Sequence, residues 1–238
     1  MPDPPTLETV DDANSAARLA SERIAAAGRQ AVAERGEFHL AISGGQTPWL
    51  MLAMLAVAEM PWEATSLYQV DERIASPGSP DRNLTHLILT LPIEKQASLR
   101  PMPVTRRSLD EAVTEYEEGL PERLDVVHLG LGVDGHTASL VPDDEVLAVT
   151  DRRVALTDGN YQGYRRMTLT YPAINAAREI VWLVTGDEKA EALRRLLAGD
   201  DSIPAGGVRG EGAVVIADAS AAGEAPPPQV PGANDPGT

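Results

Sequence analysis

The sequence predicts an α/β domain built around a mostly parallel sheet. Apolar segments typical of strands alternate with amphipathic segments typical of helices through most of the 238 residues, without a detectable repeat. The clearest strand, residues 126–131, is a continuous apolar run followed by glycines, as expected for a strand buried on both faces of a parallel sheet. Other strand-like runs also end in glycines or charged residues. Open α/β sheets bind ligands at this carboxyl edge, so a site is expected there.

The first helix and the turn after the first strand come from the pattern of small and turn-forming residues. Residues 10–32 carry small and aliphatic side chains at alternating steps of four and three, which predicts an amphipathic helix. Residues 38–42 read as a strand that passes into Ser43-Gly44-Gly45-Gln46-Thr47-Pro48. Thr47 is expected to cap a helix that starts at Pro48, and the free N–H groups of such a turn can bind an anion. An ordinary strand-to-helix turn would use the same residues.

The next strand, at residues 66–70, ends in Asp71-Glu72-Arg73. These charges lie where a ligand would bind, although a solvated loop would carry them equally well. Residues 83–91 are expected to be helical. Ser108 with Glu111 forms a capping box for a further helix that runs to residue 119.

The loop after the central strand carries the strongest chemical signal. Its glycines allow a sharp turn that delivers Asp134 and His136 to the edge of the sheet. A carboxylate and an imidazole in one tight loop are the parts of a general-base pair. The glycine spacing also matches a dinucleotide fingerprint, but residues 142–144, Pro-Asp-Asp, interrupt the helix that this fingerprint requires. The remaining histidines lie in apolar strand runs or on a helix, where structural roles are expected: His39, His86 and His128.

The carboxyl-terminal half continues the alternation. Strands are expected at residues 153–157, 165–170, 179–185 and 213–217, with a short helix at 172–177, a loop at 161–164 and a longer helix opened by residues 186–189. Lys189 lies at a helix N-terminus, where the dipole favours anions, so a bound anion would explain a cation there. Residues 1–223 are expected to form one domain, and the Pro- and Gly-rich residues 224–238 a disordered tail.

Composition narrows the classes of function. The formal net charge of −16 disfavours nucleic-acid binding and requires a local basic cluster for any anionic ligand. The absence of cysteine removes thiol chemistry and disulfides. Without a signal peptide or a long apolar run, we expect a soluble cytoplasmic protein that does not contact membranes.

Six segments resemble one known family. Ser43-Gly44-Gly45-Gln46-Thr47-Pro48, Asp71-Glu72-Arg73 and residues 130–140 look like the three signatures of the 6-phosphogluconolactonases. Residues 166–170, 175–177 and 186–190 are similar to the carboxyl-terminal half of that family in the same order. The resemblance extends over residues 10–218. Three departures are Gln46, Arg82 and the flexible turn at residues 204–207, and none of them removes a charged group that we assign to chemistry.

The resemblance implies a Rossmann-like three-layer fold, like those of glucosamine-6-phosphate deaminase and ribose-5-phosphate isomerase. It implies hydrolysis of 6-phospho-D-glucono-1,5-lactone to 6-phosphogluconate in the oxidative pentose phosphate pathway, with neither cofactor nor metal, by a monomer or homodimer. His136 is the expected base, with Asp134 or Asp71 orienting it or the substrate hydroxyls. The expected substrate-binding residues are Ser43, Gly44, Gly45, Thr47, Asp71, Arg73, Arg166 and Lys189.

Two other functions remain open. A deaminase or isomerase on the same fold would share the glycine turn and the Asp-Gly-His segment, but it would continue with a phenylalanine-asparagine-glutamate run where this chain has Thr137-Ala138-Ser139-Leu140. A sugar-phosphate sensor would have lost the aspartate or histidine, and both are present.

Overall fold

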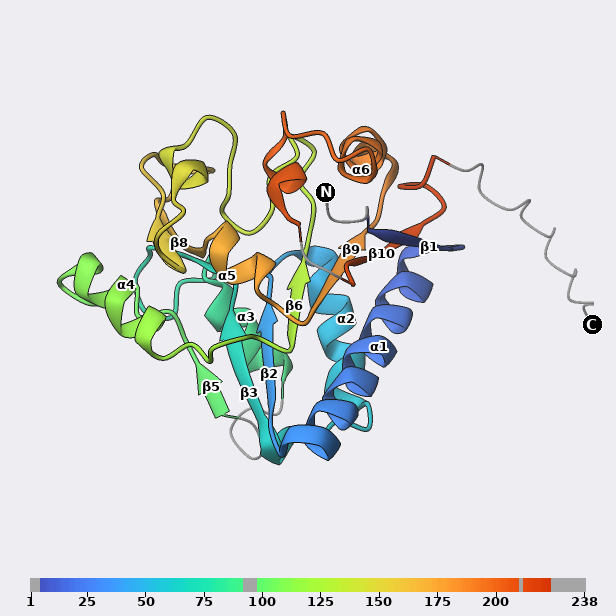
Figure 1. Cartoon of the computed structure of the whole chain (residues 1–238), viewed down its shortest axis with the longest axis horizontal. Helices are drawn as coiled ribbons and strands as arrows, with labels where there is room; N and C mark the ends of the chain where they lie inside the picture. The colour runs from blue at the N-terminus through green and yellow to red at the C-terminus, as the bar shows by residue number, and fades with distance from the viewer. Residues whose placement is uncertain (1–4, 92–97, 210–211, 224–238) are drawn as a thin grey trace, which may run out of the picture.

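The computed structural model describes residues 5–91, 98–209 and 212–223, and its main feature is a parallel sheet (Figure 1). Within these residues the sheet has seven strands in the order β1-β10-β9-β6-β2-β3-β5, and every pair is parallel. This confirms the predicted mostly parallel α/β sheet. The strands are β1 (Thr6–Val10), β2 (Phe38–Ile42), β3 (Thr65–Gln69), β5 (Ser98–Arg100), β6 (Val126–Leu129), β9 (Glu179–Val184) and β10 (Val214–Asp218).

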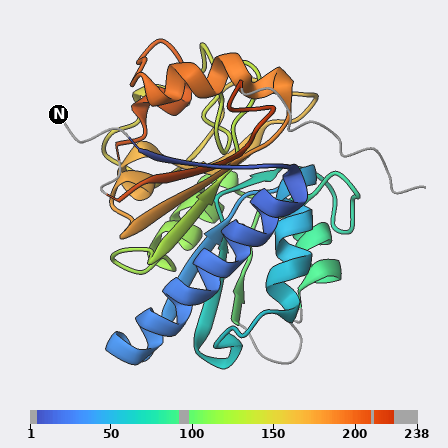
Figure 2. The ribbon, with the colours of Figure 1, turned by 90° about the vertical axis from the view of Figure 1, so that its right-hand side faces the viewer.

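Helices cover both faces of this sheet. One face carries α1 (Ala13–Arg35), α2 (Gln46–Val57) and α3 (Asn83–Thr90), and Figure 2 shows α1 and α2 side by side along it. The other face packs against α4 (Leu109–Glu118), α5 (Tyr171–Asn175) and α6 (Ala190–Leu197). Each face has its own hydrophobic core. Val126 packs in the core under α1, α2 and α3, and Val127 packs in the core under α4, α5 and α6, so β6 is buried on both faces, as its apolar run predicted.

A smaller antiparallel sheet lies on the second face, and the sequence pattern did not predict it. It has the order β4-β8-β7, formed by Asp71–Arg73 (β4), Arg166–Leu169 (β8) and Val154–Leu156 (β7). Asp71 pairs with Thr168 and Arg73 with Arg166. Two segments predicted as separate parts of the site are therefore neighbouring strands.

The sequence-based positions of the helices and most strands are confirmed, with one error at a helix start. Helix α2 begins at Gln46, its N-cap is Gly45, and Thr47 does not cap it. Gly45 turns the chain with a φ of 129°, which places the cap two residues before Thr47. The Thr47 hydroxyl instead forms a 2.7 Å hydrogen bond with the Thr185 hydroxyl, which ties α2 to the end of β9.

The predicted cap of α4 is confirmed, since the Ser108 hydroxyl accepts a hydrogen bond from the Glu111 amide. Short one-turn 3₁₀ helices complete the described fold at Trp62–Ala64, Glu145–Ala148, Asp187–Lys189 and Pro204–Gly207. The predicted tail, residues 224–238, lies outside the described residues. In the part of the chain that is described, no helix has both the length and the apolar character needed to cross a bilayer.

The order of strands places a crevice at the middle of the sheet. β2 and β6 are neighbours although they are far apart in sequence. From this pair, β3 and β5 extend to one edge, and β9, β10 and β1 to the other. The loops after β2 and β6 therefore leave in different directions, which is where α/β sheets bind ligands.

Candidate active site

A cavity of about 620 Å³ opens at the carboxyl ends of β2, β3, β6 and β9. It is lined by the segments that follow these strands, as the sequence predicted for a ligand site. Nine of the predicted site residues line it: Ser43, Gly44, Gly45, Thr47, Asp71, Arg73, His136, Arg166 and Lys189. Asp134 is not part of the wall and reaches the cavity only through its contact with His136.

The turn after β6 holds the imidazole of His136 against the carboxylate of Asp134. Oδ1 of Asp134 lies 2.5 Å from Nδ1 of His136 and accepts a second hydrogen bond from the His136 amide at 3.2 Å. A Cβ on Gly132 would lie 1.9 Å from the same Nδ1, so only glycine leaves room for the ring. Gly135 has a φ of 80°, and a Cβ there would meet Ile203 at 2.5 Å.

This arrangement fixes which nitrogen of His136 is free. Burial alone opposes ionisation of Asp134, but the hydrogen bonds from His136 and Tyr161 outweigh it and lower the pKa of Asp134. An ionised carboxylate only accepts hydrogen bonds, so Nδ1 of His136 carries the proton of the 2.5 Å contact. Nε2 then has its lone pair free, as a general base requires.

Tyr161 is a member of this group that the sequence analysis did not single out. Its hydroxyl donates to Oδ2 of Asp134 at 3.0 Å and lies 3.2 Å from Nδ1 of His136. The two rings are tilted against each other with centroids 5.0 Å apart. A tyrosine pair in the segment 161–164, beside arginines, was the available signal, but nothing in the pattern placed it next to the turn after β6.

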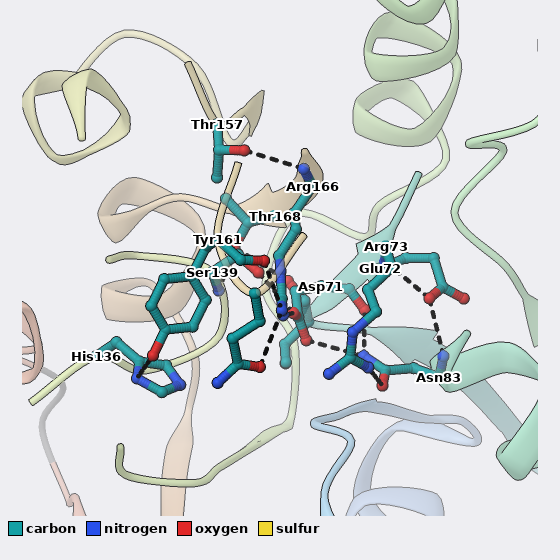
Figure 3. Close-up of polar contacts among 12 residues, drawn as sticks. Asp71, Glu72, Arg73, Asn83, His136, Ser139, Thr157, Tyr161, Arg166 and Thr168 are labelled. Atoms are coloured by element: carbon teal, nitrogen blue, oxygen red, sulfur yellow. Dashed lines mark hydrogen bonds and ion pairs between the residues drawn. The ribbon is translucent and has the colours of Figure 1, made fainter. Parts of the chain in front are cut away.

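Asp71 belongs to a second, more deeply buried polar cluster (Figure 3). Its Oδ2 accepts a 2.6 Å hydrogen bond from the Ser139 hydroxyl, and its Oδ1 accepts one from the Asn83 side chain at 3.1 Å. Nη1 of Arg166 lies 3.5 Å from Oδ2. Of the two carboxylates that the sequence left open, Asp134 therefore contacts His136, and Asp71 contacts Arg166.

Three cations lie in the wall of the cavity. Arg166 is only 4% exposed and donates to the Tyr161 carbonyl at 3.2 Å, and its Nε has no hydrogen-bond partner in the described structure. Burial, opposed by Asp71 and reinforced by the neighbouring Arg73, lowers the pKa of Arg166. Within the described residues, no carboxylate lies at ion-pair distance from the Lys189 amine. Three carboxylates, those of Asp71, Asp81 and Glu188, lie in the same wall, so its charged groups are formally balanced in a strongly acidic protein.

His86, for which a structural role was expected, also lines the cavity. Its ring stacks on Trp49 with centroids 4.9 Å apart and an interplanar angle of 23°, and its Nε2 lies 2.9 Å from the Pro80 carbonyl. The pair forms a flat wall on the α2–α3 side.

Groups of side chains that could hold a metal ion are absent from residues 5–91, 98–209 and 212–223.

Comparison with known proteins gives one consistent family. Residues 11–216 match the family described as glucosamine-6-phosphate isomerases/6-phosphogluconolactonase. The chain is 37% identical over 182 residues to 6-phosphogluconolactonase of Synechocystis, covering 71% of this chain and 75% of that protein. It is 31% identical over 259 residues to 6-phosphogluconolactonase of Streptomyces coelicolor, covering 95% and 97%.

Solved structures agree with this match. A 6-phosphogluconolactonase from Shewanella baltica superposes with a TM-score of 0.82 at 25% identity, covering 92% of this chain and 99% of that one. A monomeric glucosamine-6-phosphate deaminase superposes with a TM-score of 0.78 at 18% identity, covering 92% and 99%, which shows the shared fold alone.

Proposed function

The chain belongs to the family of glucosamine-6-phosphate isomerases and 6-phosphogluconolactonases, and we propose that His136 is its general base. It is a 6-phosphogluconolactonase, which hydrolyses 6-phospho-D-glucono-1,5-lactone to 6-phosphogluconate in the oxidative pentose phosphate pathway. We further propose that it acts in the cytoplasm, as a monomer or homodimer, without binding nucleic acid.

In the proposed mechanism, Nε2 of His136 takes a proton from a water molecule as the water oxygen attacks the lactone carbonyl. An imidazole suits this task, because its ordinary pKa of about 6.5 lies close to neutral pH. Asp134, ionised beside Nδ1, stabilises the imidazolium that forms. When the tetrahedral intermediate collapses, the ester C–O bond of the ring breaks. The imidazolium then returns the proton to the departing ring oxygen.

The proposed substrate-binding residues follow from charge and position. The phosphate needs concentrated positive charge, and Arg166 and Lys189 supply it from the wall that also holds His136. Arg73 lies on the same wall, although its guanidinium already donates to the Asp81 carbonyl at 2.8 Å. Backbone N–H groups of the turn that contains Ser43, Gly44, Gly45 and Thr47 are candidates for the oxyanion donors.

The observation that carries this proposal is the 2.5 Å contact between Asp134 and His136 in a cavity that also holds buried arginine. A histidine oriented by a carboxylate has the geometry of a general base, and the cations select a phosphorylated substrate. The His136→Ala variant tests the role of His136 as general base. We expect turnover of the lactone to fall by about a hundredfold or more, with an unchanged far-UV circular dichroism spectrum.

The assay follows loss of the lactone against its spontaneous hydrolysis. Near-wild-type turnover in the His136→Ala variant would remove the base assignment. Ammonia release from glucosamine 6-phosphate would instead favour the deaminase reaction, and binding without acceleration of lactone loss would favour a sensor.

A further inference from the structure

The turn that contains Tyr161 and Tyr164 connects two carboxylates on different loops. Tyr161 donates to Asp134 at 3.0 Å, and Tyr164 donates to Asp81 at 2.7 Å. The turn is closed by a hydrogen bond from the Tyr161 amide to the Tyr164 carbonyl at 2.9 Å. Only the first of these hydroxyls lies next to the imidazole of His136.

We propose that Tyr161 is a positioning residue for the general base, an inference that rests on the proposed function of His136. Its single hydroxyl proton faces Oδ2 of Asp134 and Nδ1 of His136. Because Nδ1 donates its own proton to Oδ1, the phenol gives its proton to Oδ2. The carboxylate is thus held at both oxygens, and its Oδ1 stays in place to accept the proton of Nδ1.

The phenol is itself held in place from the other side. The guanidinium of Arg166 lies 5.2 Å from the centre of the Tyr161 ring, and its Nη2 donates to the Tyr161 carbonyl at 3.2 Å (Figure 3). The guanidinium also contacts Gln162 of the same turn at 3.4 Å. Burial, followed by the hydrogen bond to Asp134, raises the pKa of Tyr161, so the hydroxyl remains a donor at neutral pH. A residue of the proposed phosphate site therefore touches the residue that positions the base.

The Tyr161→Phe variant tests this inference, and Tyr164→Phe is its matched control. Both changes remove one hydroxyl from the same turn, and both leave a carboxylate without that donor. Loosening of the turn would affect the two variants alike, whereas positioning of the base would be lost only in Tyr161→Phe. We expect kcat of Tyr161→Phe to fall by about tenfold with KM within about twofold, and Tyr164→Phe to stay near wild type.

The pH profile of kcat/KM distinguishes positioning of the base from a purely structural role, because a structural role would leave the acid limb of the profile unchanged. The titratable and charged groups around the base are Asp134 and Tyr161, in contact with it, and a set in the cavity wall: Asp71, Arg73, Asp81, His86, Arg166, Glu188 and Lys189. Without the phenol, the negative charge of Asp134 is no longer shared with a second donor and acts more strongly on the imidazolium. The acid limb of the profile should therefore shift to higher pH in Tyr161→Phe only.

Nitrogen-15 NMR of the histidine rings provides a second measurement, with the His136 signals assigned by their loss in His136→Ala. Wild type and Tyr161→Phe should both show the Nδ1-protonated tautomer of His136, because Asp134 only accepts, and the His136 signals should be broadened in Tyr161→Phe, where Oδ2 of Asp134 has lost its donor. Equal kcat values and equal acid limbs for the two tyrosine variants, beside an inactive His136→Ala, would overturn the role of Tyr161 alone. An active His136→Ala variant would overturn the base assignment, and the role of Tyr161 with it.

Discussion

His128 is buried in the centre of the sheet and contributes nothing to the cavity. It lies in β6 with 0% exposure, and neither ring nitrogen has a hydrogen-bond partner in the described structure. Burial lowers its pKa to about 3, so the ring is neutral in the folded protein at neutral pH. Two unpaired nitrogens in an apolar core cost free energy of folding.

This burial predicts how stability depends on pH. The unfolded chain binds a proton at His128 below its ordinary pKa of about 6.5, and the folded chain does not until about pH 3. The free energy of unfolding should therefore decrease as pH falls from 6.5 towards 3, with about 2 kcal/mol lost by pH 5. Urea unfolding of wild type and His128→Leu at pH 7.5 and pH 5 measures this contribution.

The His128→Leu variant should be more stable at pH 7.5 by about 1 kcal/mol, because leucine brings no unpaired nitrogen, and should lose less stability at pH 5. A His128→Asn variant separates the two effects, since it stays polar but does not titrate. Equal pH dependence in wild type and both variants would mean that His128 does not contribute it.

Cavity residues were predictable from the sequence where a polar side chain lies in the turn directly after a buried strand. Asp71 and His136 were predicted in this way to lie at the carboxyl edge of the sheet, and both line the cavity there, because parallel strands deliver their carboxyl ends to one edge. Tyr161 was not, since it lies 25 residues from His136 and its partners depend on how the turn packs. The cap assigned to Thr47 was wrong for a similar reason: a glycine with positive φ ended the loop earlier, and the hydroxyl found a tertiary partner.

At the scale of elements, Glu72 joins β4 to the start of α3. It is fully buried, and its Oε1 accepts hydrogen bonds from the amides of Arg73 and Asn83, both at 2.8 Å. Its Oε2 accepts from the Leu84 amide and the Gln69 side chain, both at 2.9 Å. One carboxylate thus replaces the missing side-chain cap of α3 and fixes the strand that carries Asp71 and Arg73.

The Glu72→Gln variant should lower the free energy of unfolding by about 2–4 kcal/mol. An amide has a single acceptor oxygen, so its NH₂ group would face donors, and the buried guanidinium of Arg82, 3.4 Å from Glu72, would lose its counter-charge. Glu115→Gln is the matched control, because its pair with Arg106 is exposed and should contribute less than about 1 kcal/mol. Similar losses of stability in the two variants, measured by urea unfolding, would contradict the capping role.

Periodicity predicted the buried elements and failed for the exposed ones. Helix α1 and strands β2, β6 and β9 bury continuous apolar stripes, which leave a clear mark in the sequence. β1 and β5 were missed because neither has a fully buried residue, so no apolar run identifies them. The antiparallel pairing of β8 with β4 and β7 was unpredictable, since a strand pattern does not specify its neighbour.

At the scale of the whole molecule, the fold separates two opposing electrostatic requirements. The chain has 36 acidic and 20 basic residues, and yet in the cavity wall Arg73, Arg166 and Lys189 balance the three carboxylates at the proposed phosphate site. The crevice between β2 and β6 makes this possible, because loops from distant parts of the sequence converge there. The acidic surplus is left for the rest of the surface, where it favours solubility and opposes compaction.

Added salt should consequently stabilise the fold. With a formal net charge of −16, mutual repulsion of the surface carboxylates opposes the folded state, and salt screens charges that lie more than about 10 Å apart at 0.1 M. Buried pairs such as Asp71 with Arg166 are screened much less, because solvent ions do not reach them. We expect the thermal midpoint to rise by roughly 3 °C between 20 and 300 mM NaCl.

An uncharged osmolyte at equal osmolality, which leaves charges unscreened, serves as the control in the same calorimetric series. A midpoint that falls with NaCl would mean that favourable surface pairs, such as Arg106 with Glu115, outweigh the long-range repulsion.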